Sequence, residues 1–216
     1  MAFEGYSPET VDFLWGIRMN NNREWFAAHK DAYVRTLYEP TKALAQELFV
    51  PFLDRPGNLL KVSRIYRDMR MHPPEPYKQS LWICIRQDVA WWAENPCLYF
   101  EINPEGVDYG FFLWKMPTAR MEEFRQSIAA RPEEFLAIVA AAEAAAGIPL
   151  TAELYARPKP CDNPALARFF AWKQCISCSV HEDFGEGTFS PALAARVRTH
   201  FEHLLPVYEY FTRFRS

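Results

Sequence analysis

The chain has 216 residues, of which half are hydrophobic and 16% aromatic, which suits the core of one domain. A net charge of −3 excludes general electrostatic attraction to nucleic acid or to an anionic membrane, so we expect no nucleic-acid or membrane partner. No apolar run approaches the roughly 20 residues of a membrane helix, and residues 1–5 lack signal-peptide features. We therefore expect a cytoplasmic protein.

The first third of the chain has the pattern of helices. Ser7-Pro8-Glu9 places a capping hydroxyl, a proline and an acid at a helix start. Asn21 and Glu24 have the spacing of a capping box and predict a second helix there. Pro40 permits a third helix, and apolar residues behind these starts recur at helical spacing.

The middle of the chain changes to a two-residue rhythm. Residues 98–102 and 107–113 alternate between core-type and more polar side chains, and Asn103-Pro104-Glu105-Gly106 between them has type I turn chemistry. The pattern predicts a β-hairpin over residues 98–114 and a neighbouring strand at Leu81–Arg86. Because the links between these strands are short, we expect an antiparallel sheet.

The last third predicts helices at 118–129 and 132–146, a strand at Lys173–Val180, and a long helix that starts at Ser190-Pro191. Pro206 should kink this last helix. Strands and helices in separate blocks indicate an α+β fold, with a mainly antiparallel sheet packed against several helices. Neither a linker nor a repeat interrupts the chain, so we expect a single domain over residues 1–216.

The most chemically suggestive segment runs from Lys61 to Lys78. Between Lys61 and Arg70, basic residues recur at every third position with one acid, Asp68, among them. A proline-rich stretch then leads to Tyr77 and Lys78. An arginine fork suits bidentate binding of carboxylate or phosphate, and Asp68 is placed to hold one fork. The predicted ligand-binding residues are Arg64, Arg67, Arg70, Tyr77 and Lys78.

Several stretches resemble the bacterial family called domain of unknown function 2461. The resemblance is carried in order along nearly the whole chain, and the Arg-Ile-Tyr-Arg-Asp run is its most specific part. It implies a single-domain bacterial protein and supplies no activity and no catalytic residues. The matching stretches are Asn20–Phe26, Arg64–Arg70, Pro76–Lys78, Tyr99–Ile102 with Gly106, and Arg125–Leu136.

Two stretches depart from the family pattern. The pattern has Lys-Asp-Lys-Thr before Pro-Tyr-Lys, whereas this chain has the shorter His72-Pro73-Pro74-Glu75. If the family's lysines help to bind an anion, the pocket is less positive here. Cys161-Asp162-Asn163-Pro164 stands where relatives tend to have Asp-His-Pro, so a functional histidine at that place is absent from this chain.

Other chemistries find weaker support. Five cysteines are too few for a disulfide scaffold. Cys175, Cys178, His181 and Cys161 are potential zinc ligands, but residues three apart in a strand face opposite ways, so we expect no metal.

No dinucleotide fingerprint, glycine-rich phosphate loop or nucleophile elbow is present, so we expect no cofactor. The tryptophans at 82, 91, 92 and 114 are expected to fill core, although one that lines a pocket would stack on a ring.

The carboxylates that suit acid–base catalysis are Asp68, Glu24 and Glu101, because each has aromatic neighbours. Desolvation would raise their pKa values and arginine neighbours would lower them, and the sequence does not decide which effect wins.

Two functions follow. In the first, the basic segment binds or acts on a small anionic ligand, a phosphate or a carboxylate. In the alternative, the chain is a non-catalytic interaction or structural domain whose arginines are internal ion-pair partners. Whether the chain is an enzyme, and its oligomeric state, stay open.

Overall fold

The first third of the chain is helical, as its sequence pattern predicts. The computed structural model describes residues 2–71 and 73–214. Helix α1 (Pro8–Met19) starts after Ser7, which forms a capping box with Thr10. A second helical run contains α2 (Arg23–Ala28), α3 (Lys30–Ala32), the π-helix η1 (Tyr33–Tyr38), α4 (Glu39–Phe49) and η2 (Val50–Phe52). The three predicted helices are confirmed.

A six-stranded sheet follows, with the order β1-β2-β3-β4-β6-β5 and only antiparallel neighbours. The predicted strands are confirmed as β2 (Leu81–Gln87), β3 (Cys97–Ile102), β4 (Gly106–Leu113) and β6 (Trp172–Asp183). The edge strands β1 (Asn58–Val62) and β5 (Thr151–Leu154) were not predicted. The α+β class holds.

The C-terminal half supplies the remaining helices. Helix α5 (Thr118–Ala130) and helix α6 (Pro132–Ala146) match their predictions, and α6 ends at Gly147, whose φ of 72° requires a residue tolerant of the left-handed region. Short helices η4 (Pro164–Leu166) and α7 (Ala167–Phe170) precede β6, and η3 (Trp92–Glu94) precedes β3. The last helix is α8 (Ala192–Thr212), with Pro206 inside it. No helix in the described ranges is both long enough and apolar enough to cross a bilayer.

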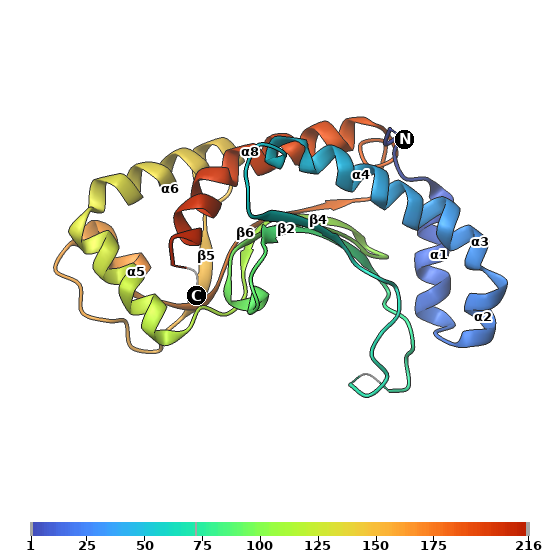
Figure 1. Ribbon diagram of the computed structural model, residues 1–216, viewed down its shortest axis with the longest axis horizontal. Coiled ribbons are helices and arrows are strands. Elements are labelled where there is room, and N and C mark those ends of the chain that lie inside the picture. The colour runs from blue at the N-terminus through green and yellow to red at the C-terminus, as the bar shows by residue number, and fades with distance from the viewer. Residues whose placement is uncertain (1, 72, 215–216) are drawn as a thin grey trace.

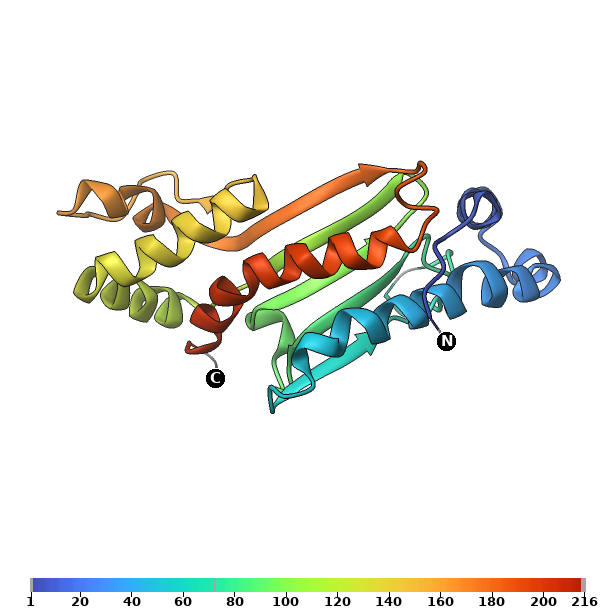
Figure 2. The ribbon, with the colours of Figure 1, turned by 90° about the horizontal axis from the view of Figure 1, so that it is seen from above.

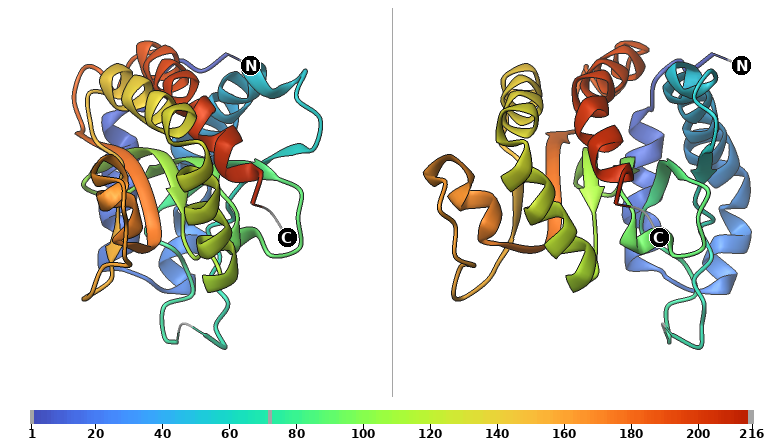
Figure 3. Two further views of the ribbon diagram at one scale, coloured as in Figure 1. Left: turned by 90° about the vertical axis from the view of Figure 1, so that its left-hand side faces the viewer. Right: turned by 60° about the vertical axis from the view of Figure 1, so that its left-hand side comes forward.

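The long helices lie on one side of the sheet. Helix α4 packs against β1 and β2, α8 packs against β3 and β4, and α6 packs against α8. Figure 1 shows these helices above the sheet, and Figure 2 shows α8 running over the strands with α4 beside it. The segment between β1 and β2 extends from the opposite side, as Figures 1 and 3 show. We call the sheet face turned away from α4 and α8 the open face.

Strand alternation divides the side chains between the two faces. Ile83 and Ile85 of β2 and Phe100 of β3 are fully buried in the core under α4 and α8. The residues between them, such as Cys84 and Tyr99, belong to the open face. Burial of the alternate apolar side chains therefore fixes which residues reach the open face.

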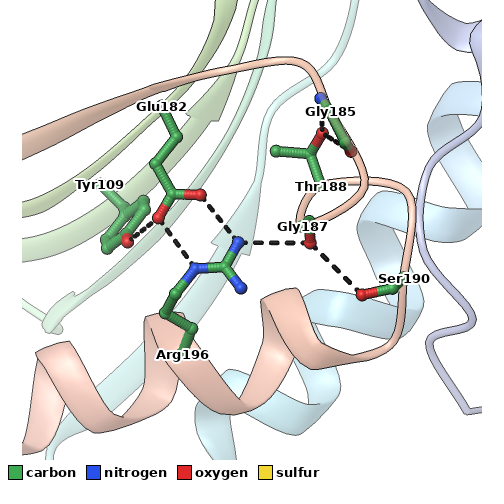
Figure 4. Close-up of polar contacts among 7 residues, drawn as sticks. All are labelled: Tyr109, Glu182, Gly185, Gly187, Thr188, Ser190 and Arg196. Atoms are coloured by element: carbon green, nitrogen blue, oxygen red, sulfur yellow. Dashed lines mark hydrogen bonds and ion pairs between the residues drawn. The ribbon is translucent and has the colours of Figure 1, made fainter.

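An ion pair on the helix side fastens α8 to the sheet, as Figure 4 shows. Arg196 of α8 donates to both carboxylate oxygens of Glu182 in β6, at 2.9 and 2.7 Å, and Tyr109 of β4 donates to the same carboxylate. Arg196 also donates to the carbonyl oxygen of Gly187 in the loop before α8. These contacts hold the helix layer in place and belong to the side of the sheet away from the open face.

Candidate functional site

The described residues between β1 and β2, 63–71 and 73–80, form an arm whose two sides pair around Tyr66 and Tyr77. Tyr66 and Tyr77 pair across it, and the flanking backbone bonds run from Arg67 N to the oxygen of Pro76 (2.9 Å) and from Lys78 N to the oxygen of Ile65 (2.7 Å). Its position at the end of the sheet is visible in Figure 1. The arm thus carries the basic segment on an ordered backbone.

Helix α2 and Asn21, which precedes its cap, anchor the arm through two hydrogen bonds and one ring contact. The Asn21 side chain donates to the carbonyl oxygen of Tyr77 (2.9 Å) and accepts from the Tyr77 N–H (3.0 Å). The Phe26 ring stacks on the Tyr77 ring at 4.2 Å between centroids. The predicted capping box is therefore wrong in detail. Asn22 caps α2 by accepting from Trp25 N, while the Asn21 side chain bonds to the backbone of the arm.

Three predicted ligand-binding residues are engaged inside the arm. Arg67 pairs with Glu75 at 2.8 Å. Arg70 donates to both oxygens of Asp68, at 3.0 and 2.6 Å, so Asp68 holds an arginine fork as expected. Tyr77 is buried beneath the aromatic contacts with α2, and this burial raises the pKa of its hydroxyl. His72, part of the departure from the family pattern, lies outside the described residues.

Two lysines of the segment, Lys61 and Lys78, lie near one indole ring, that of Trp82. Lys61 Nζ lies 5.8 Å and Lys78 Nζ 5.4 Å from the centroid of Trp82, and Lys78 also donates to the carbonyl oxygen of Arg64 (2.7 Å). Within residues 2–71 and 73–214, no carboxylate lies within ion-pair distance of Lys61, Arg64 or Lys78. Burial, followed by the neighbouring positive charges, lowers the pKa of Lys78.

A cavity of about 400 Å³ opens beside Trp82 on the open face. Its walls come from β1, β2, β3, β4 and η3, which lie next to one another in the sheet or at its end. Most of the lining is aromatic or apolar, with two cations and one carboxylate. The lining residues are Lys61, Trp82, Ile83, Cys84, Arg86, Trp92, Cys97, Tyr99, Glu101 and Phe112.

Strand register explains how these side chains meet. Trp82, Cys84 and Arg86 alternate along β2, and Cys84 stands opposite Lys61 of β1 and Tyr99 of β3. Adjacent strands lie about 4.8 Å apart, so one small molecule spans two or three of these positions. The expectation that Trp91, Trp92 and Trp114 fill core is wrong, because they are 68%, 50% and 57% exposed. Trp82 lines the cavity, which is the position that the sequence analysis gave as the alternative to a place in the core.

Arg86 is the most unusual group in the cavity. Its side chain is only 9% exposed, and one guanidinium nitrogen donates to the carbonyl oxygen of Gln87 at 2.8 Å. No carboxylate in the described part of the chain pairs with it. Buried charges in proteins are normally paired, because removal from water is costly. The bottom of the cavity therefore holds a positive charge without a carboxylate partner.

Of the three predicted catalytic carboxylates, only Glu101 reaches the cavity. It accepts a hydrogen bond from Ser80 at 2.5 Å. Burial, the largest effect, and the nearby charge of Asp108 raise the pKa of Glu101, against the opposing influence of Ser80 and Lys78. Desolvation thus wins over ion pairing at this position. Glu24 is exposed on α2, and Asp68 is engaged with Arg70.

Beyond Glu101 along the same sheet row lies an acid–histidine pair. Asp108 stands opposite Glu101 on one side and His181 on the other. His181 Nδ1 lies 2.9 Å from Asp108, and this contact raises the pKa of the imidazole. The four potential zinc ligands of the sequence analysis are not brought together: Cys178 is buried in the core, and no group of three metal-binding side chains occurs in the described ranges.

Sequence reasoning missed Arg86 and the two cysteines of the cavity as functional residues. The signal that would have found them is the alternation in Trp82-Ile83-Cys84-Ile85-Arg86, which puts an indole, a thiol and a guanidinium on one face of a strand. The basic segment drew attention instead, because charges adjacent in sequence are easier to see than side chains adjacent in a sheet.

Fold and site together define an α+β protein with a helix-covered antiparallel sheet and a cation-containing pocket on the open face. A family model described as "Conserved hypothetical protein (DUF2461)" matches residues 9–210. The chain belongs to this family, and the resemblance seen in the sequence is confirmed. No curated protein and no solved structure matches the chain.

Proposed function

We propose that the protein binds a small organic anion, a carboxylate or a phosphate with an apolar body, in the cavity on the open face. The observation that carries the proposal is Arg86, a buried guanidinium in an aromatic-lined cavity with no carboxylate partner among the described residues. A bound anion would supply the missing charge, and an arginine fork is shaped for bidentate contact with either group.

The rest of the lining fits the same ligand class. Lys61 adds a second cation at the β1 side of the cavity. Trp82, Tyr99 and Trp92 supply faces on which an apolar or ring-containing body would stack. A cavity of about 400 Å³ falls in the usual range for small-molecule sites. We thus assign the anion-binding role to the cavity instead of to the arm. Lys78 is the predicted ligand-binding residue that lies beside the cavity, next to Trp82.

Glu101 gives this pocket a group able to exchange a proton. Its raised pKa brings the carboxyl closer to neutral pH than an exposed glutamate. Facing the cavity between Trp82 and Asp108, it would donate a hydrogen bond to an anion when protonated and repel it when ionised. Ligand affinity should therefore rise as the pH falls through the Glu101 pKa.

A thermal-shift screen of carboxylates and phosphates, followed by calorimetry on the compounds that raise the melting temperature, tests the proposal. Arg86→Met should weaken binding about tenfold or more, because it removes a charge-assisted contact. Lys61→Met should weaken it less. The matched control is Lys42→Met, since Lys42 also lies over an aromatic ring, that of Tyr38 at 5.3 Å, but sits on α4.

The proposal is wrong if the control variant loses as much affinity as the cavity variants. It is equally wrong if Arg86→Met and Arg86→Lys, both still folded by circular dichroism, bind the screened compounds as the unmodified chain does. Arg86→Lys keeps the charge and loses the fork, so an intermediate affinity supports bidentate binding.

The alternative function, an interaction domain with structural arginines, has its own supporting observation. Arg67 and Arg70 have carboxylate partners within the arm, and Trp91 and Trp114 are exposed. Substitution of Arg67 by alanine separates the two functions. Loss of folding would favour the structural role, while an intact fold with normal ligand binding at the cavity would favour the pocket.

A further inference from the structure

Two free thiols lie side by side at the floor of the cavity. Cys84 of β2 stands opposite Tyr99, and Cys97 of β3 stands opposite Arg86, so the two cysteines are diagonal neighbours on adjacent strands. Both belong to the open face and both line the cavity. Each residue is nearly buried, at 6% and 8% exposure, so the cavity is the route by which a ligand would reach them.

The surroundings of the pair favour a thiolate at Cys84. The contact between the two thiols lowers the pKa of Cys84 and raises the pKa of Cys97, which burial raises as well. The positive charges of Arg86 and Lys61 lower the pKa of Cys84 further. These cations lack carboxylate partners in the described ranges, so a negative charge on the sulfur atoms would be compensated in place.

We propose that Cys84 and Cys97 bind one soft monovalent metal ion, Cu(I), as a two-thiolate complex. Thiolate ligands select Cu(I) over harder cations. Zinc sites take four ligands, whereas the described residues offer no group of three metal-binding side chains. Cu(I) accepts as few as two ligands, and the pair supplies two sulfur atoms on adjacent strands.

The binding step balances without an oxidant or a reductant. Two S–H bonds are replaced by two S–Cu(I) bonds, two protons are released to solvent, and copper stays in its monovalent state. The product carries one net negative charge, which Arg86 and Lys61 offset. Because protons compete with the metal for sulfur, affinity should increase with pH. The site goes beyond the binding of an organic anion and does not require one.

The test is an anaerobic titration of the full chain with Cu(I) in competition with the chromophoric chelator bicinchoninate. We expect one Cu(I) to be retained per chain. Its affinity should rise from pH 6 to pH 8, because fewer protons then compete with the metal for the sulfur atoms. Cys84→Ser and Cys97→Ser should each lower the affinity at least tenfold, since one thiolate is lost. Cys175→Ser is the matched control, because Cys175 lies on β6 and its thiol bonds to the carbonyl oxygen of Trp114.

X-ray absorption on the unmodified chain gives a readout that does not depend on the folding of variants. Two sulfur ligands on copper support the proposal, and nitrogen or oxygen ligands overturn it. Unchanged affinity in folded Cys84→Ser and Cys97→Ser overturns it as well, as does a failure to retain Cu(I). Titration of Cys84→Ser with an organic anion in the absence of copper separates this proposal from the preceding one, since that variant should lose copper and keep the anion.

Discussion

Asn20, Asn21 and Asn22 are consecutive residues of one type with three different roles, and their alanine variants should differ accordingly. Asn21 makes two hydrogen bonds to the backbone of Tyr77. At about 1 kcal/mol for each bond, Asn21→Ala should lower the free energy of unfolding by about 2 kcal/mol. In a domain of this size, that loss corresponds to a fall in melting temperature of about 4–8 °C.

The alanine variants of the neighbouring asparagines are the controls against which the loss of stability in Asn21→Ala is compared. Asn22→Ala removes the cap of α2 and should cost about 1 kcal/mol. Asn20→Ala removes an exposed bond to the carbonyl oxygen of Gly16 and should cost less than about 0.5 kcal/mol. Urea unfolding with an unchanged m-value measures all three.

Hydrogen exchange locates the effect of Asn21→Ala. The amide of Tyr77 should exchange faster in this variant and keep its protection in the other two, because it is Asn21 that accepts its hydrogen bond. Equal costs for the three variants, or an unchanged exchange rate at Tyr77, would refute the assignment of Asn21 as the anchor of the arm.

Three further outcomes are expected. Because the pKa of Glu101 is raised, its contribution to stability is present below the ordinary glutamate pKa and is lost as the pH rises through the folded-state pKa. In urea unfolding, Glu101→Gln should therefore gain stability over the unmodified chain as the pH rises above about 4. The pKa of His181 is also raised, so its pairing with Asp108 stabilises the fold at low pH and ceases to do so as the pH rises through the folded-state pKa. In an NMR titration, Asp108→Asn should lower the pKa of His181. An unchanged His181 pKa in this variant would contradict the contact. Arg67→Ala should fold and cost no more than about 1 kcal/mol by denaturant unfolding, since its pair with Glu75 is partly exposed.

Elements with strong local signals could be predicted from the sequence. The alternation over residues 98–114 and the apolar run of β2 identified the centre of the sheet, and Pro132 with Gly147 marked both ends of α6. Strands β1 and β5 were missed for physical reasons. Strand β1 ends in the basic segment, whose spacing by three hid the alternation, and β5 is short, largely exposed and irregular in register.

The sequence pointed to the part of the chain next to the cavity, the segment from Lys61 to Lys78, but not to most of the residues that line the cavity. The ion pairs Arg67–Glu75 and Arg70–Asp68 join residues close in sequence, so local neutralisation was one of the alternatives that the sequence offered. The role of Arg86 depends on which face of β2 the helices α4 and α8 cover, and that choice is made by contacts between distant parts of the chain. Pairing of side chains across strands is likewise set by register rather than by spacing in one strand.

The walls of the cavity have a consequence for the order of folding. All of its lining residues fall between Lys61 and Phe112, on the short helix η3 and on the strands β1 to β4, which pair with their nearest neighbours along the chain. Strand β6, by contrast, reaches β4 only after α5, α6 and β5 have been traversed. Loop closure costs more entropy for longer connections, so contacts among β1 to β4 should form before β6 docks. During synthesis, the part of the open face that lines the cavity would thus take shape while the C-terminal third is still emerging from the ribosome.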